Sequence, residues 1–102
     1  MPRALRTLRV NWSPVPEGLI LAIDQGTGSS KAIVVDARGA VVAHGSASIG
    51  QVSVNPGWVE QDASLIWESQ MQAVRNTLGL AGVSAADVQA IGITNQRETT
   101  VV

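Results

Sequence analysis

A short glycine-rich segment near the N-terminus holds the side chains with the clearest chemical potential. Between two apolar runs, residues 24–31 read DQGTGSSK, with one acid, one base, two glycines and three hydroxyl side chains. Because glycine and other small residues leave backbone N–H groups uncovered, such a loop can bind the anionic oxygens of a phosphate. The acid, Asp24, could hold a Mg²⁺ ion that screens the same phosphates. The alternative is an ordinary glycine-rich turn without a ligand.

The spacing of this segment does not fit the two best-known phosphate loops. A Walker A loop needs Gly-x-x-x-x-Gly-Lys-Ser/Thr at the start of a helix, whereas Lys31 follows two serines and precedes the strand-like run AIVV. A dinucleotide fingerprint needs three glycines and a helix, and only Gly26 and Gly28 are present. We therefore expect a hairpin loop whose backbone N–H groups and hydroxyls contact phosphate. The hydroxyls belong to Thr27, Ser29 and Ser30.

Short β-rich runs on either side must position this loop. Residues 19–24 (LILAID), 31–36 (KAIVVD) and 40–47 (AVVAHGSA) read as three strands. The first has the continuous apolar character of a strand that is buried on both faces. The short connections leave no room for a helix, so the three strands should form an antiparallel meander.

One helix and one further strand are expected after the meander. Asp62 is a plausible N-cap, and the apolar residues behind it recur at spacings of four, three and four, which marks one helix face. These residues are Trp67, Met71, Val74 and Leu78. Gly79 suits the position that ends the helix, and Ser84–Asp87 could cap a further turn. Residues 88–94 (VQAIGIT) then form a strand parallel to an earlier one. After NQRE, the run TTVV at 99–102 starts like another strand.

The composition limits the function classes. At 102 residues and a net charge of −1, the chain corresponds to one small domain or part of one, with no electrostatic reason to bind nucleic acid. It contains no cysteine, which excludes disulfides and thiolate metal sites and makes an intracellular setting the default. No apolar run approaches the roughly 20 residues that a membrane-spanning helix needs. Residues 1–18 are expected to be a disordered tail or a mispredicted start, with an arginine-rich targeting peptide as the alternative.

Three segments occur in the order and at the spacing seen in the FGGY carbohydrate kinases. They are AIDQGTGSSKAIVVD, NPGWVEQD and IGITNQRETTVV. From Leu19 to Val102 the sequence resembles the N-terminal part of this family, and GITNQRETT is typical of members that phosphorylate glycerol. The resemblance implies an α/β protein with the ribonuclease H-like, actin-type ATPase fold. Residues 19–102 would then be part of its first lobe, which begins with the same βββαβ order.

The resemblance also implies roles for particular residues. Asp24 matches the acid that coordinates the metal, usually through water, and Lys31 takes the place of a basic residue that can approach the transferred phosphoryl group. Arg97 and Glu98 match the pair that binds glycerol: a guanidinium donates to hydroxyl oxygens and a carboxylate accepts from the same hydroxyls. The loop that grips the nucleotide phosphates comprises Gly26, Thr27, Gly28, Ser29 and Ser30, together with Lys31.

The implied activity is ATP-dependent phosphorylation of glycerol to glycerol 3-phosphate, with ATP and Mg²⁺ as cofactors. A cytoplasmic location and a homo-oligomer are expected for the full-length family member. In this family the catalytic base, an aspartate in a Gly-Asp-Gln element, belongs to sequence beyond Val102, so no catalytic residue is assigned within this chain. The isolated chain is therefore expected to be inactive, because phosphoryl transfer depends on positioning between two lobes.

Two departures from the family pattern leave the substrate open. Gly28 stands where members that use glycerol usually carry threonine, and Lys31 replaces arginine, so a bidentate fork becomes a point charge. Both changes are common in sugar-specific members, which makes a kinase for another polyol or a pentose the alternative. A non-catalytic nucleotide-binding remnant and an actin-like structural or chaperone-type ATPase lobe also stay open. The Arg97–Glu98 pair and the segment NPGWVEQD argue against the structural ATPase.

Overall fold

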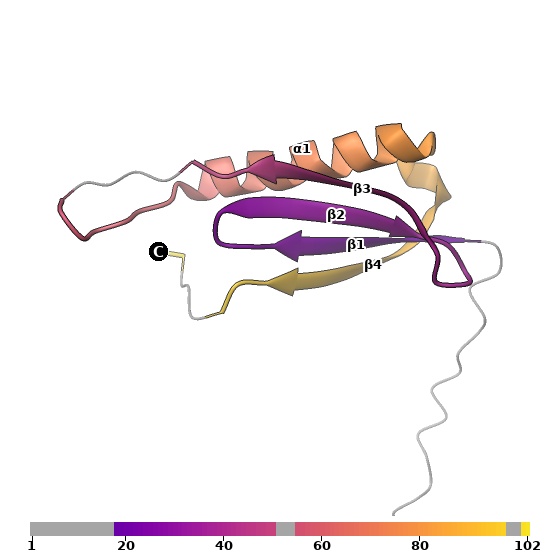
Figure 1. Ribbon diagram of the computed structural model, residues 1–102, viewed down its shortest axis with the longest axis horizontal. Coiled ribbons are helices and arrows are strands. Elements are labelled where there is room, and N and C mark those ends of the chain that lie inside the picture. Colours follow the sequence, from indigo (N-terminus) through magenta and orange to yellow (C-terminus); the bar gives the residue numbers. More distant parts are fainter. Residues whose placement is uncertain (1–17, 51–54, 98–100) are drawn as a thin grey trace, which may run out of the picture.

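Four strands and one helix form a two-layer unit (Figure 1). The computed structural model describes residues 18–50, 55–97 and 101–102. The strands are β1 (Leu19–Gln25), β2 (Ser29–Val35), β3 (Val41–Ser48) and β4 (Val88–Asn95). Helix α1 spans Ala63–Ala81, and a single 3-10 turn, η2 (Ala85–Asp87), precedes β4. The predicted order of three strands, a helix and a fourth strand is confirmed. The predicted tail at 1–18, except for Gly18, and the start of the TTVV run lie outside the described residues.

The sheet has the strand order β3-β2-β1-β4. Strands β1, β2 and β3 pair antiparallel as the predicted meander, because their connecting turns are short. Strand β4 pairs parallel to β1, as predicted, since the chain reaches it through α1. The carboxyl ends of β1 and β4 therefore lie at the same edge of the sheet.

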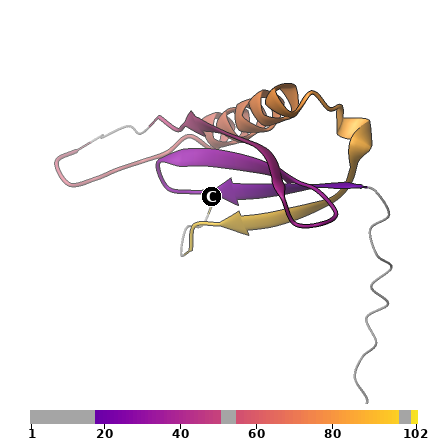
Figure 2. The same cartoon turned by 45° about the vertical axis from the view of Figure 1, so that its right-hand side comes forward.

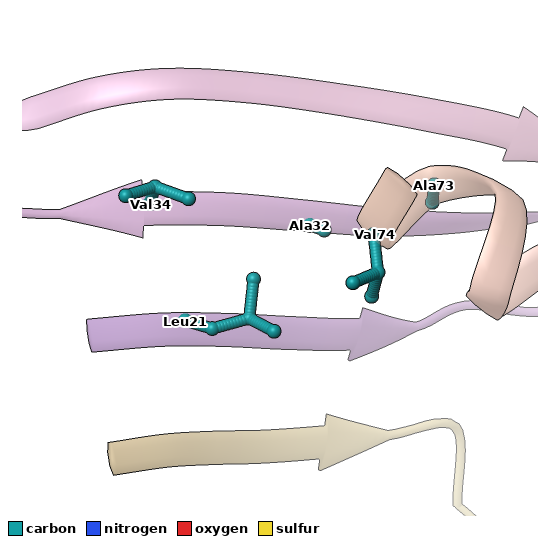
Figure 3. Packing of buried hydrophobic residues seen from close by; sticks show 5 residues of the cluster. All are labelled: Leu21, Ala32, Val34, Ala73 and Val74. Atoms are coloured by element: carbon teal, nitrogen blue, oxygen red, sulfur yellow. The ribbon is translucent and has the colours of Figure 1, made fainter. Parts of the chain in front are cut away.

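Helix α1 covers one face of the sheet and packs mainly on β2 and β3 (Figure 2). Figure 3 shows the buried side chains between the two layers, which come from β1, β2 and α1. They are Leu21, Ala32, Val34, Ala73 and Val74. The expectation that β1 would be buried on both faces is wrong within the described structure, because among its seven residues only Leu21 is fully buried. On β4, which α1 does not cover, Ile91 is 58% exposed and Ile93 75% exposed.

The buried face of α1 is not the predicted apolar stripe. Its most buried positions are small or polar, whereas Trp67 is 66% exposed. Ser69, Ala73 and Thr77 recur every four residues and lie against β2 and β3, where bulky side chains would hold the layers apart. Of the predicted stripe, Val74 is buried and Leu78 packs at the margin of the core. Where α1 packs closely on β2 and β3, the small size of a side chain therefore matters more than its hydropathy.

The ends of α1 confirm one predicted cap and correct the other. The Asp62 carboxylate accepts from the Ser64 N–H at 2.7 Å, as expected of an N-cap. The helix does not end at Gly79 but continues to Ala81, because Gly82 adopts the left-handed backbone (φ 68°) that closes it. The Gly82 N–H donates to the Gly79 carbonyl and the next N–H to the Leu78 carbonyl, both at 3.2 Å.

A substitution at Gly45 tests the close contact between the layers. A Cβ atom at Gly45 would lie 2.7 Å from the Thr77 Oγ1 and 3.5 Å from the Ala73 carbonyl oxygen. Gly45→Ala should therefore lower the free energy of unfolding by about 1–3 kcal/mol, measured by urea titration. Gly79→Ala is the matched control: nothing lies within 4 Å of its Cβ, and it should raise stability by about 0.5–1 kcal/mol. Equal effects of the two changes would contradict this packing.

Candidate functional site

The glycine-rich segment is the turn of the β1–β2 hairpin. The last paired residues are Gln25 and Ser30, and the Gly26 N–H donates to the Ser29 carbonyl at 3.0 Å across the turn. A strand follows, not a helix, so the predicted hairpin loop is confirmed. The turn is shorter than predicted, since β2 begins at Ser29, where its residues already pair with β3. Only residues 26–28 remain outside the strands, and we call them the hairpin turn.

The two glycines of the hairpin turn differ in their structural roles. A Cβ at Gly26 would lie 2.9 Å from the Ser29 carbonyl oxygen, so this position needs glycine for the close turn. A Cβ at Gly28 would meet nothing within 4 Å, and its backbone is not left-handed. Gly28 is therefore not required by the turn, and its bare backbone leaves the turn accessible from outside.

All three carbonyl oxygens of the hairpin turn accept hydrogen bonds, one from the adjacent Gln25 side chain and two from distant residues. The Gln25 Nε2 donates to the Gly26 carbonyl at 3.3 Å, and the Gln61 Nε2 donates to the Thr27 carbonyl at 2.7 Å. The Ile49 N–H donates to the Gly28 carbonyl at 3.0 Å. Carbonyl oxygens would repel an anion, and each of these is engaged by a donor.

The backbone N–H groups of Thr27 and Gly28, in contrast to the carbonyls, are available as donors. Neither donates a hydrogen bond to any residue in the described part of the chain. Both residues are exposed, and the Thr27 hydroxyl adds a third donor at the same place. Engaged carbonyls and available donors together give a surface that suits an anionic oxygen.

Ser30 supports the hairpin turn from beneath. It is fully buried, and its hydroxyl donates to the Gln25 Oε1 at 3.0 Å. The Ser69 hydroxyl of α1 lies 3.0 Å from the Ser30 hydroxyl and 3.1 Å from the Ala47 carbonyl. In this structure the buried Ser30 hydroxyl belongs to the network that holds Gln25, and its predicted contact with a phosphate stays a prediction.

The two glutamines that hold the turn, Gln25 and Gln61, could not be recognised from the sequence. Gln25 was visible as the residue before Gly26, and Gln61 as part of NPGWVEQD, but neither has a pattern that reveals its partner. A hydrogen bond between residues 34 positions apart depends on where α1 begins, and only the folded structure gives that.

Asp24 and Lys31 lie on the sheet face opposite α1. They are direct cross-strand neighbours, and Thr94 of β4 pairs with Asp24 on the other side, so all three project from the same face. Both charged side chains are exposed. No group of three or more metal-ligating side chains occurs among residues 18–50, 55–97 and 101–102. A lone exposed carboxylate still suits Mg²⁺, which usually keeps several water ligands and binds through one or two carboxylates.

Arg97 lies beside the hairpin turn. Asn95 at the end of β4 pairs with Gln25, and the Gln96 N–H donates to the Gln25 carbonyl at 2.8 Å. The next residue is Arg97, which is exposed. Arg97 therefore follows the strand end at the same sheet edge as the hairpin turn, and Figure 1 shows the end of β4 beside that turn. Glu98 lies outside the described residues.

No helix in the described segments is long and apolar enough to cross a membrane.

Comparison with known proteins gives a consistent set of relatives. A family profile described as "FGGY family of carbohydrate kinases, N-terminal domain" matches residues 19–102. A curated glycerol kinase of Delftia acidovorans is 52% identical over 83 residues, covering 81% of this chain but only 17% of the relative.

Solved structures show the same likeness. A Plasmodium falciparum glycerol kinase with ADP superposes with a TM-score of 0.70 and 31% identity, over 81% of this chain and 17% of that one. A xylulose kinase from Rhodospirillum rubrum gives a TM-score of 0.66 and 27% identity, over 78% of this chain and 16% of that one. The chain thus spans about one sixth of the length of the relatives it matches.

Proposed function

The chain belongs to the FGGY family of carbohydrate kinases, and we propose that it forms the phosphate- and polyol-binding edge of an enzyme that phosphorylates glycerol with ATP. Its fold is part of the actin-type ATPase fold of these kinases. The observation that carries the proposal is the bond from the Gln96 N–H to the Gln25 carbonyl at 2.8 Å. It joins the start of the hairpin turn to the segment that bears Arg97, so one small site can serve both substrates.

The hairpin turn is proposed to hold the phosphates of the nucleotide. The N–H groups of Thr27 and Gly28 and the Thr27 hydroxyl would donate to the anionic oxygens. Ser29 and Lys31 share the sheet face of Asp24, and the Lys31 ammonium would approach the transferred phosphoryl group as a point charge. Asp24 would hold Mg²⁺ through water, and the ion would neutralise charge that develops during transfer.

Arg97 and Glu98 are proposed to bind glycerol. A guanidinium donates to two hydroxyl oxygens and a carboxylate accepts from the same hydroxyls, which fixes a small polyol in one orientation.

The base that deprotonates the attacking hydroxyl is proposed to lie in the remainder of the enzyme, beyond Val102. The isolated chain is therefore expected to bind phosphate without turnover. For the whole enzyme we propose a cytoplasmic homo-oligomer.

Another polyol or a pentose is the second candidate substrate. Lys31 and Gly28 favour it, and a xylulose kinase is among the structural relatives. We favour glycerol because Arg97 lies within the intact segment NQRETT and because the glycerol kinase of Delftia acidovorans is 52% identical.

Titration with inorganic pyrophosphate tests the phosphate-binding part of the proposal. In amide-resolved NMR of the isotope-labelled chain, the largest shifts are expected at Thr27 and Gly28. The β2–β3 turn is a matched control, because it also contains a glycine, Gly39, but its donors are engaged. The Asp36 carboxylate there accepts from the Arg38 and Ala40 N–H groups, each at 2.9 Å. These two hydrogen bonds also lower the pKa of the Asp36 carboxyl group, and the bond from the Ala40 N–H has the larger effect. Equal shifts in the two turns would contradict a dedicated site.

A further inference from the structure

Gln61 contacts the hairpin turn from a distant part of the chain. Its Nε2 donates to the Thr27 carbonyl at 2.7 Å, across 34 residues of sequence. The next residue, Asp62, is fixed as the N-cap of α1 by its bonds to the Ser64 and Ile66 N–H groups. Gln61 therefore connects the hairpin turn to the first turn of the helix.

The bond from Gln61 to the Thr27 carbonyl also fixes the direction of the Gly28 N–H, which belongs to the same peptide group. The peptide bond is planar, and in its trans form the carbonyl oxygen and the following N–H point in opposite directions. No cis peptide bond occurs in the described residues. By holding the Thr27 carbonyl on one side, Gln61 fixes the Gly28 N–H on the other. Gln25 acts in the same way on the Thr27 N–H through the Gly26 carbonyl, with a longer bond of 3.3 Å.

We propose that Gln61 is a positioning residue for phosphate binding, which aims the Gly28 N–H at the anion and couples this amide to the start of α1. The inference rests on the proposed function of the hairpin turn. Without the Gln61 amide, the peptide between Thr27 and Gly28 can rotate, because neither residue lies in a strand and a Cβ at Gly28 would meet nothing within 4 Å. An anion would then have to order this peptide at the moment of binding.

The test compares Gln61→Met with Gln72→Met. Methionine keeps the length of the side chain and its lack of charge but removes the N–H donor. Gln72 is an exposed glutamine of α1 whose Nε2 donates to Asn76 at 2.8 Å, away from the hairpin turn. Each labelled 102-residue chain is titrated with inorganic pyrophosphate and followed at every amide.

Gln61→Met is expected to weaken pyrophosphate binding by about 2- to 10-fold, the range of one lost hydrogen bond. The chemical-shift change on pyrophosphate binding should shrink more at the Gly28 amide than at the Thr27 amide. The Thr27 N–H belongs to the same peptide group as the Gly26 carbonyl, which Gln25 still holds. Gln72→Met should bind like the wild type. Gln61→Asn, which keeps the amide on a shorter side chain, should fall between them.

The outcomes separate this inference from the proposed function. If the wild type binds pyrophosphate at Thr27 and Gly28 and Gln61→Met binds it equally well, the role of Gln61 is refuted and the phosphate site stands. If the wild type shows no shift there, both fail. If Gln61→Met changes the amide spectrum throughout the sheet before any ligand is added, Gln61 stabilises the whole fold, and the specific coupling to Gly28 is refuted.

Discussion

Replacing Arg97 with alanine should lower kcat/KM for glycerol by about 10- to 100-fold, the range for a lost hydrogen bond from a charged group. The setting for this measurement is a chimera in which residues 19–102 replace the matching segment of the Delftia acidovorans glycerol kinase. The guanidinium is proposed to donate to glycerol hydroxyls, and a polyol that is free to rotate would reach the attacking geometry less often. Both KM and kcat should therefore change.

The control for this substitution is Arg75→Ala. Arg75 is an exposed arginine of α1. Helix α1 covers one face of the sheet, whereas Asp24 and Lys31 project from the other face. Its loss should leave the kinetics of the chimera unchanged. The polyol assignment of Arg97 would be refuted if the two variants phosphorylated glycerol equally well at all glycerol concentrations.

Replacing Asp24 with asparagine should lower kcat in the same chimera by at least about 100-fold, because a metal ion contributes several kcal/mol of charge stabilisation in phosphoryl transfer. The amide keeps the shape of the side chain and its place in β1 but loses the negative charge that is proposed to attract the ion. The Mg²⁺ concentration for half-maximal rate should rise as well. Initial rates over a Mg²⁺ series measure both effects.

Glu68→Gln provides the matched change from acid to amide. Glu68 is exposed on α1, whereas Asp24 projects from the opposite side of the sheet. The control should keep the Mg²⁺ dependence of the parent chimera. An Asp24→Asn variant with the parent's rate and Mg²⁺ dependence would show that the metal is held elsewhere.

The parts of the fold that depend on local connections could be predicted from the sequence. Turns of a few residues force β1, β2 and β3 into a meander, and a crossover through a helix makes β4 parallel to β1. These two facts already place Arg97 beside the hairpin turn. The shared edge of the candidate site therefore follows from topology, without knowledge of side-chain packing.

The parts that depend on packing between layers could not be predicted in this way. The spacing of Trp67 and Val74 marks an apolar stripe, but α1 approaches β3 so closely at Gly45 that small residues take the contact. Gly79 and Gly82 are equally good helix ends in sequence, and only the backbone conformation distinguishes them. The bond from Gln61 to Thr27 depends on the same docking of α1.

Whether residues 19–102 can serve in a glycerol-phosphorylating enzyme is measured by the rate at which the unmodified chimera phosphorylates glycerol with ATP. If residues 19–102 supply the hairpin turn, Asp24 and Arg97 of a glycerol-phosphorylating enzyme, the chimera should form glycerol 3-phosphate within about tenfold of the parent's kcat/KM, a change of up to about 1.4 kcal/mol. A chimera that has the parent's melting temperature and binds ADP, yet forms no glycerol 3-phosphate above background, would show that residues 19–102 do not supply this part of the active site.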